Sequence, residues 1–222
     1  RLDQDPELAG AAVEIFEYSP FFADQCLRDP DLLGEITRFG AAFPRDNPED
    51  PVELRRFFSR EMIRIQSESL CRSVPIFETL GKTSDLADRV IASAYQIAIW
   101  NRLGATPPSN TAYIPHDQMQ VIALGRLGVR EFDVGSDADL VFVIPDEDAG
   151  EHRFWTAVAE SLIDIISAYT GDGVIFSVDT RLRPYGREGS LVQTVSMYKE
   201  YFSSQAEAWE GIAYMKARGV AG

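Results

Sequence analysis

The sequence has little of several residue types on which common protein classes depend. It has two cysteines, Cys26 and Cys71, too few for a disulfide framework, and they are expected to be reduced thiols of a cytoplasmic protein. Its two histidines lie outside any nucleophile motif, so a histidine-based metal centre and a Ser-His-Asp triad are poorly supported. No apolar run approaches the roughly 18 residues of a membrane span, and the start, LDQDPEL, does not predict a signal peptide.

Positive charge is also scarce. The formal net charge is −14, from 21 basic and 35 acidic residues. Proteins that bind a phosphate backbone usually carry a basic patch, whereas basic residues here are scattered apart from Arg181, Arg183 and Arg187. The composition therefore disfavours nucleic acid as a partner. It permits a nucleotide site, in which metal ions neutralise carboxylates and a few arginines hold phosphates.

The most informative stretch is residues 121–146, VIALGRLGVREFDVGSDADLVFVIPD. An apolar run, residues 121–124, ends at Gly125, and a second glycine, Gly128, follows shortly after. A second apolar run covers residues 140–144. This order of apolar runs and glycines predicts a strand, a glycine turn and a second strand.

Two carboxylates stand at the head of the second predicted strand. Asp137 and Asp139 are two residues apart, so their side chains share one face of a strand. Carboxylates that close repel unless a cation or a proton lies between them, and two divalent metals roughly 3.5–4 Å apart suit in-line phosphoryl transfer. Gly125 and Gly128 would let backbone N–H groups approach a phosphate. An Asp-x-Asp pair alone is more often a solvated loop or a helix cap, but its place after the glycine turn favours a metal site.

A third carboxylate, Asp179, follows a short strand-like run at residues 174–178. Alone, an aspartate in that position is usually a turn residue. Together with Asp137 and Asp139 it completes the set that a two-metal nucleotidyl transferase needs. Two of the carboxylates would bridge both metals, and the third would hold the catalytic metal and help to deprotonate the attacking oxygen.

Helical patterns fill most of the remaining chain. Helices are predicted between residues 5 and 40, at 52–70, from Ser84 to about 104, from about 154 to 170, at 194–203 and at 206–218. Asp85 and Asp88 would lie in the first turn of the helix that begins at Ser84. The segment TPPSN, residues 106–110, is the clearest linker, and it predicts a helical region at 1–105 followed by a catalytic domain at 111–222.

Several motifs in order resemble the bacterial glutamine-synthetase adenylyltransferase/adenylyl-removing enzymes, a family of polymerase-β-type nucleotidyltransferases. The family pattern is a Gly-Lys-x-Gly turn, a Glu-Leu segment, Ser-Asp-x-Asp-Leu, then Val-Asp-x-Arg-Leu-Arg-Pro-x-Gly, Trp-Glu and Lys-Ala-Arg. The matching segments here are GRLG at 125–128, EF at 131–132, SDADL at 136–140, VDTRLRPYG at 178–186, WE at 209–210 and KAR at 216–218. The region before the catalytic part is more weakly similar.

Three departures from the family pattern stand out. Arg126 occupies the place of the usual lysine and can bind phosphate with a different geometry. Asp133 replaces a common asparagine, and Gly211 stands where arginine or histidine is frequent. The family enzyme carries two catalytic halves, so this chain is expected to be one half of a longer protein.

The resemblance implies a helix-rich α+β fold of the polymerase-β type, with a small mixed sheet preceded by a helical region. It implies ATP as a substrate, Mg²⁺ or Mn²⁺ as the metal and glutamine synthetase as the partner, with a nitrogen-signalling regulatory protein as a further candidate. The implied metal ligands and catalytic residues are Asp137, Asp139 and Asp179. The implied nucleotide-binding residues are Gly125, Arg126, Gly128, Ser136, Arg181 and Arg183. The two arginines could instead pair with nearby acids or order the Asp179 strand.

The sequence is compatible with three functions. The first is adenylyl transfer from ATP to a tyrosine of glutamine synthetase, and the second is phosphorolytic removal of that adenylyl group. The third is a regulatory domain without turnover, against which the three intact aspartates argue. Both halves of the family enzyme share these motifs, so the sequence does not separate transfer from removal.

Overall fold

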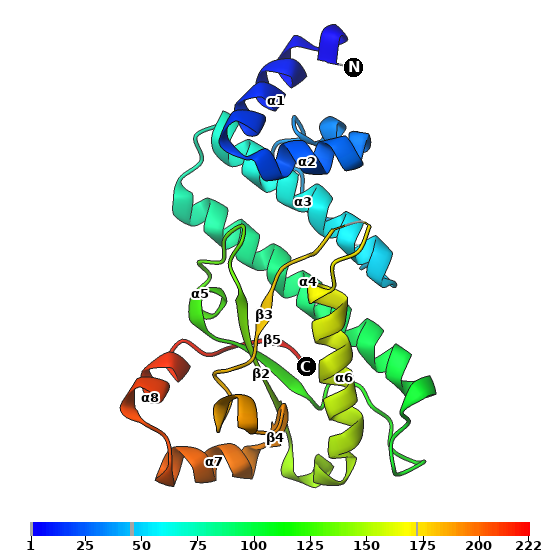
Figure 1. Cartoon of the computed structure of the whole chain (residues 1–222), viewed down its shortest axis with the longest axis vertical. Helices are drawn as coiled ribbons and strands as arrows, with labels where there is room; N and C mark the ends of the chain where they lie inside the picture. Colours follow the sequence, from blue (N-terminus) through cyan, green and yellow to red (C-terminus); the bar gives the residue numbers. More distant parts are fainter. Residues whose placement is uncertain (1, 45–46, 172) are drawn as a thin grey trace.

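The computed structural model describes residues 2–44, 47–171 and 173–222. In the described part of the first 105 residues the regular secondary structure is helical, and in Figure 1 the first three α-helices lie in the upper part of the molecule while the fourth runs from there down past the sheet. The elements are η1 (Leu2–Gln4), α1 (Pro6–Tyr18), α2 (Pro20–Arg28), η2 (Pro30–Glu35), α3 (Pro51–Cys71) and α4 (Ile76–Ala105). The short helices predicted between residues 5 and 40 and the helix predicted at 52–70 are thereby confirmed.

Helix α3 begins where local chemistry favours a helix start. The Asp50 carboxylate accepts hydrogen bonds from the backbone N–H groups of Val52 and Glu53, at 2.8 and 2.9 Å. Pro51 occupies the first helical position, where its missing N–H costs nothing. Arg55, one of several arginines along α3, is buried and donates to the carbonyl of Ile165, so α3 is tied to the later part of the chain.

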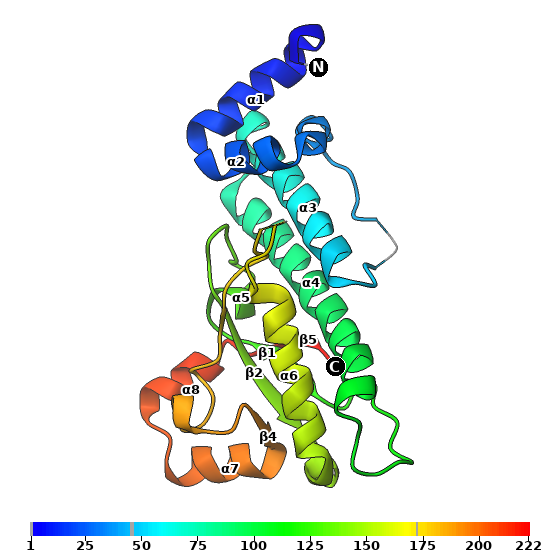
Figure 2. The same cartoon turned by 45° about the vertical axis from the view of Figure 1, so that its right-hand side comes forward.

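Helix α4 contradicts the predicted helix start at Ser84. The helix already begins at Ile76, and the Ser84 hydroxyl lies in its interior, donating to the Leu80 carbonyl and accepting from the N–H of Phe132. A single interior glycine, Gly81, costs only about 1 kcal/mol. Because α4 packs along α3 and α6 (His152–Ser167), tertiary contacts support the additional turns (Figure 2).

A five-stranded mixed sheet occupies the lower part of the molecule. Its strands are β1 (Gln120–Ala123), β2 (Ala138–Ile144), β3 (Val178–Asp179), β4 (Val192–Thr194) and β5 (Arg218–Ala221). Strand β1 pairs antiparallel with β2 and β5, and β2 pairs parallel with both β3 and β4. The strand–glycine turn–strand prediction is confirmed, with the turn formed as the single-turn helix α5 (Gly125–Gly128). The predicted run at 174–178 forms a strand only at its end, in β3.

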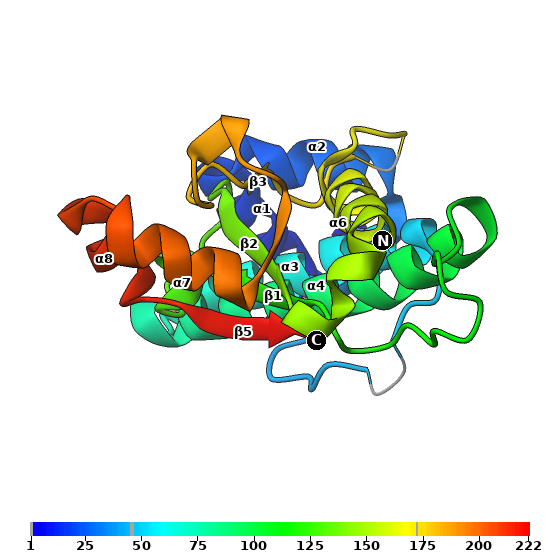
Figure 3. The ribbon, with the colours of Figure 1, turned by 90° about the horizontal axis from the view of Figure 1, so that it is seen from below.

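The remaining elements surround this sheet. They are η3 (Asp146–Glu151), α6, η4 (Gly186–Glu188), α7 (Val195–Ser204) and α8 (Ala208–Tyr214). The helix predicted at 206–218 is wrong in its second half, because α8 ends at Tyr214 and β5 follows. The chain there extends along the free edge of β1 and completes the sheet, as the view from below shows (Figure 3).

The predicted first-turn role of Asp85 and Asp88 is also wrong, since both lie inside α4. Asp85 instead pairs with Arg130, at 2.6 Å. The Asp88 carboxylate accepts hydrogen bonds from both terminal nitrogens of Arg218, at 2.6 and 2.9 Å, and Arg218 also donates to the carbonyl of Leu127. These contacts fasten β5 and the segment after α5 to helix α4.

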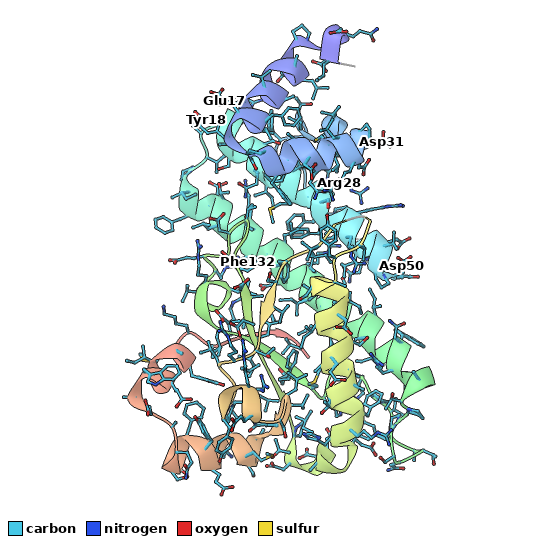
Figure 4. All side chains as sticks on the ribbon, in the orientation of Figure 1. Glu17, Tyr18, Arg28, Asp31, Asp50 and Phe132 are labelled. Carbon is cyan, nitrogen blue, oxygen red and sulfur yellow. The ribbon has the colours of Figure 1, made fainter. Side chains whose placement is uncertain are left out.

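One hydrophobic core runs through the helical region and the sheet region. Tyr95 on α4 stacks on Trp155 of α6, with ring centroids 6.3 Å apart. Phe132, labelled in Figure 4, packs edge-on against Phe176, and Phe176 packs against Phe58 on α3. The predicted α+β class with a small mixed sheet is confirmed, while the domain division at 106–110 stays a prediction. Within the described ranges, no helix is both long and apolar enough to cross a bilayer.

Candidate active site

The sheet register brings the predicted carboxylates together. Strand β2 pairs with β3 in parallel, and Asp139 is the direct partner of Asp179 in that register. Partner residues on adjacent strands present their side chains on the same face of the sheet. Asp137 lies two residues before Asp139 and joins them, since it lines the same cavity as Asp179. Residues 42 positions apart in the chain, Asp137 and Asp179, thereby share one site.

Asp139 is the innermost of the three carboxylates. Its pKa is raised, first by burial and then by the negative charges of Asp179 and Asp137. It also lies directly against Gly125, since a β-carbon placed on Gly125 would come within 2.2 Å of the Asp139 carboxylate. Gly125 has a left-handed backbone, with φ of +53°, which suits glycine. The glycine turn is therefore shaped around the Asp139 carboxylate.

Asp179 is held by Arg181. The Arg181 Nε lies 3.0 Å from one carboxylate oxygen and 2.7 Å from the other, and its Nη2 also contacts the carboxylate. The backbone N–H of Arg181 donates to the same group at 2.8 Å. The side-chain hydrogen bonds are the main reason that the pKa of Asp179 is lowered. Asp179 is consequently ionised and neutralised by a neighbouring cation.

The three carboxylates suit a hard divalent cation, because Mg²⁺ and Mn²⁺ prefer carboxylate oxygens as ligands. A bound cation would also relieve the repulsion that Asp179 and Asp137 exert on Asp139. Among the described residues, however, no group of three or more His, Cys, Asp or Glu side chains is already arranged to bind a metal. Both oxygens of Asp179 face Arg181 instead. The residue types fit the metal, and Asp179 can join the ligand set when Arg181 moves away.

Replacement of Arg181 by glutamine should therefore strengthen binding of Mn²⁺ to the nucleotide-free protein. The ion pair that competes with the metal is lost, and since the Arg181 side chain is 61% exposed the gain should be only about two- to fivefold. Titration of Mn²⁺ followed by electron paramagnetic resonance measures it. Arg153→Gln, which changes an exposed arginine on α6, should leave Mn²⁺ affinity unaltered. Weaker binding in Arg181→Gln would show that the arginine holds Asp179 ready for the metal.

Arg183 has a different environment from Arg181. Its Nε donates to the carbonyl of Gly189 at 2.9 Å, and its Nη1 donates to the carbonyl and hydroxyl of Thr180 at 2.8 and 2.9 Å. Its Nη2 donates to the carbonyl of Arg187 at 3.0 Å. These bonds agree with the expectation that Arg183 could order the segment after Asp179. Its role in nucleotide binding stays a prediction.

The remaining predicted nucleotide-binding residues each have a different environment. Arg126 is directed to the following loop, where it donates to the Glu131 carbonyl at 3.1 Å and lies 3.8 Å from an Asp133 oxygen. Gly128 packs under the chain before β5, since a β-carbon there would be 2.1 Å from the Lys216 carbonyl. Ser136 lines an apolar cavity beside the site. Packing thus explains the glycine at position 128, while the parts of Arg126, Gly128 and Ser136 in nucleotide binding stay predictions.

The cavity beside Asp137 and Asp179 contains residues to which the sequence motifs assigned no role. It measures about 540 Å³, and its lining includes Ser177, Thr180 and Arg187. The cluster of basic residues at 181–187 was the available signal for Arg187. Two residues of the final family motifs make structural contacts: Glu210 accepts from the Tyr201 hydroxyl at 2.7 Å, and Arg218 anchors β5 on Asp88.

The sequence around this site is similar to that of known proteins. Residues 9–222 match the family model described as glutamate-ammonia ligase adenylyltransferase. The chain belongs to this family. The match covers both the helical region and the carboxylate site, so the adenylyltransferase family as a whole includes the helices that precede the sheet.

Curated relatives from several bacteria agree with the adenylyltransferase family. The chain is 33% identical to a protein of Pseudomonas syringae pv. tomato over 92% of its own length and 24% of the relative's. It is 38% identical to a protein of Pseudomonas putida, over 86% of the chain and 20% of the relative, and 34% identical to one of Streptomyces coelicolor, over 78% and 17%. Each is named bifunctional glutamine synthetase adenylyltransferase/adenylyl-removing enzyme. The chain spans a quarter or less of the length of these relatives.

Proposed function

We propose that this chain is a catalytic unit that transfers an adenylyl group from ATP to a tyrosine of glutamine synthetase, using Mg²⁺ or Mn²⁺. The observation that carries the proposal is the pairing of Asp139 with Asp179 on adjacent parallel strands, with Asp137 two residues earlier. Family membership and the names of the relatives support the choice of substrate. A polymerase-β-like fold, cytoplasmic location and contact with a nitrogen-signalling protein belong to the same proposal.

The reaction is an in-line displacement at phosphorus. The tyrosine oxygen forms a bond to the α-phosphorus of ATP and gives up its proton, and the bond between that phosphorus and the bridging oxygen breaks to release pyrophosphate. When bound by Asp137, Asp139 and Asp179, Mg²⁺ or Mn²⁺ would supply Lewis-acid stabilisation of the charge on the phosphoryl oxygens. Asp179 orients the attacking hydroxyl, and backbone N–H groups at residues 125–127 with Arg126 bind the triphosphate, while the Gly128 N–H donates to the Leu124 carbonyl at 2.8 Å.

The removal reaction is a second candidate, and the positive charge beside Asp179 favours it. An oxygen of inorganic phosphate would attack the same phosphorus, the bond to the tyrosine oxygen would break, and ADP would leave while the tyrosine regains a proton. The attacking group is then an anion. Arg181 contacts Asp179 directly, and Arg187 lies close enough to help lower the pKa of Asp179. An anionic nucleophile would be attracted to these two cations.

Intact-mass spectrometry of glutamine synthetase tests both candidates. Unmodified glutamine synthetase with ATP and Mg²⁺ or Mn²⁺ should gain one adenylyl group if the chain catalyses transfer. Adenylylated glutamine synthetase with inorganic phosphate should lose that group if the chain catalyses removal. If neither mass changes while circular dichroism shows a folded chain, the catalytic proposal fails and a regulatory domain is favoured.

A further inference from the structure

Arg187 is an exposed arginine at the rim of the candidate active site, and the transfer reaction proposed above gives it no ligand of its own. It lines the cavity that contains Asp137 and Asp179. Within residues 2–44, 47–171 and 173–222, its guanidinium forms no hydrogen bond or ion pair that satisfies the usual distance limits. Arg181 is paired with Asp179, and Arg183 is bound to backbone carbonyls. Of these three arginines, Arg187 therefore has the donors that are free to bind a ligand.

The loop that carries Arg187 is held in one shape. Arg183 donates to carbonyl groups on both sides of the loop, at Thr180 and at Gly189, and to the carbonyl of Arg187 itself. The N–H of Gly186 donates to the Arg183 carbonyl at 2.8 Å, which closes a turn. Arg187 is thus attached to a loop whose backbone is fixed by the side chain of its neighbour.

Glycine at position 189 is required by the same packing. A β-carbon on Gly189 would lie 2.0 Å from the carbonyl oxygen of Pro184. Tyr185 and Gly186, between these two residues, both have left-handed backbones, with φ of 63° and 57°. These turns fix the course of the loop, so the place of Arg187 in the lining of the cavity follows from the backbone.

We propose that Arg187 binds a phosphate group of the substrate beside Asp179. The inference rests on the proposed function, which it deepens by assigning a residue to the phosphate subsite. A guanidinium presents several N–H donors in a planar fork that matches phosphate oxygens, and it keeps its charge at every physiological pH. The cavity of about 540 Å³ leaves room for a phosphate and for the groups attached to it.

Two ligands could present phosphate oxygens to Arg187. One is inorganic phosphate, the attacking group in the removal reaction, and the other is the terminal part of the ATP triphosphate in the transfer reaction. Arg187 would bind either of these ligands only through its phosphate oxygens, so the affinity for adenosine should not depend on Arg187. Separate titrations with inorganic phosphate, with a non-hydrolysable α,β-methylene analogue of ATP and with adenosine distinguish these ligands.

The test compares wild-type protein, Arg187→Gln, Arg187→Lys and the control Arg153→Gln by isothermal titration calorimetry with Mg²⁺. Arg187→Gln should weaken binding of inorganic phosphate or of the ATP analogue about tenfold or more, since a charge-assisted hydrogen bond is lost. Arg187→Lys should recover part of the affinity, and Arg153→Gln should match the wild type. Thermal unfolding of each variant shows that the fold is retained.

The outcomes separate this inference from the proposed function. A loss confined to inorganic phosphate assigns Arg187 to the attacking phosphate, and a loss confined to the ATP analogue assigns it to the triphosphate. If wild-type protein binds these ligands and Arg187→Gln binds them equally well, Arg187 is a solvated surface residue and the inference is wrong. If wild-type protein binds neither ligand, the proposed function fails as well.

Discussion

Substitution of Asp137 by asparagine should reduce turnover by about 10³-fold or more while leaving the fold intact. The change removes one negative charge from the carboxylate set and so weakens metal binding. Loss of the charge stabilisation that the metal supplies raises the activation free energy by several kcal/mol, and each 1.4 kcal/mol lowers the rate roughly tenfold. Asp137 is exposed and precedes β2, so the hydrophobic core does not depend on it. The rate of adenylyl gain or loss by glutamine synthetase, measured by mass spectrometry, gives the result.

Asp164→Asn is the matched control for this experiment. Asp164 is also an exposed carboxylate, and it lies on α6 away from the carboxylate cluster. Turnover and melting temperature of this variant should equal those of the wild type. Retained turnover in Asp137→Asn would remove the metal-pair interpretation, because the site cannot then depend on that carboxylate.

Substitution of Gly125 by alanine should lower turnover about 100-fold and also destabilise the protein. The left-handed backbone, with φ of +53°, costs an L-residue about 1–2 kcal/mol. The new methyl group would come within 2.2 Å of the Asp139 carboxylate and displace it. A displacement of roughly 1 Å in a catalytic group can cost about 100-fold in rate. Thermal melts and the mass-spectrometric rate measure the two effects separately.

Gly40→Ala is the control that measures the stability cost of a left-handed backbone by itself. Gly40 has a similar left-handed φ of +66°, but a β-carbon there would meet no atom within 4 Å. Gly40→Ala should lose about 1–2 kcal/mol of stability from the backbone conformation alone, no more than Gly125→Ala loses, and should keep wild-type turnover. Equal turnover in the two variants would mean that the contact between Gly125 and Asp139 has no part in catalysis.

The strand–glycine turn–strand unit was predictable because its signals are local. Apolar runs of strand length, the glycines at 125 and 128, and the two-residue spacing of Asp137 and Asp139 are all read within one short segment. The long helices α3 and α6 were predictable for the same reason. The cap at Asp50 followed by Pro51 also marks the start of α3 in the sequence.

The ends of two elements were not predictable from local signals. Helix α4 continues back past Ser84 because the additional turns pack on α3, and a Ser-Asp start signal carries less free energy than that packing. The chain after Tyr214 does not continue as a helix, because β5 pairs with the free edge of β1 and Arg218 binds the carboxylate of Asp88. Both partners are distant in the sequence.

The amino-acid sequence by itself determined the α+β class, the family and the three carboxylates with their order along the chain. Only the tertiary structure decided which partner each charged group has. It pairs Asp179 with Asp139 across two strands, joins Arg181 to Asp179, directs Arg183 to backbone carbonyls and places Arg187 in the lining of the cavity. The reason is physical: periodicity along the chain reports on neighbours a few residues apart, whereas charge pairing depends on distances through space that arise when separate segments pack together.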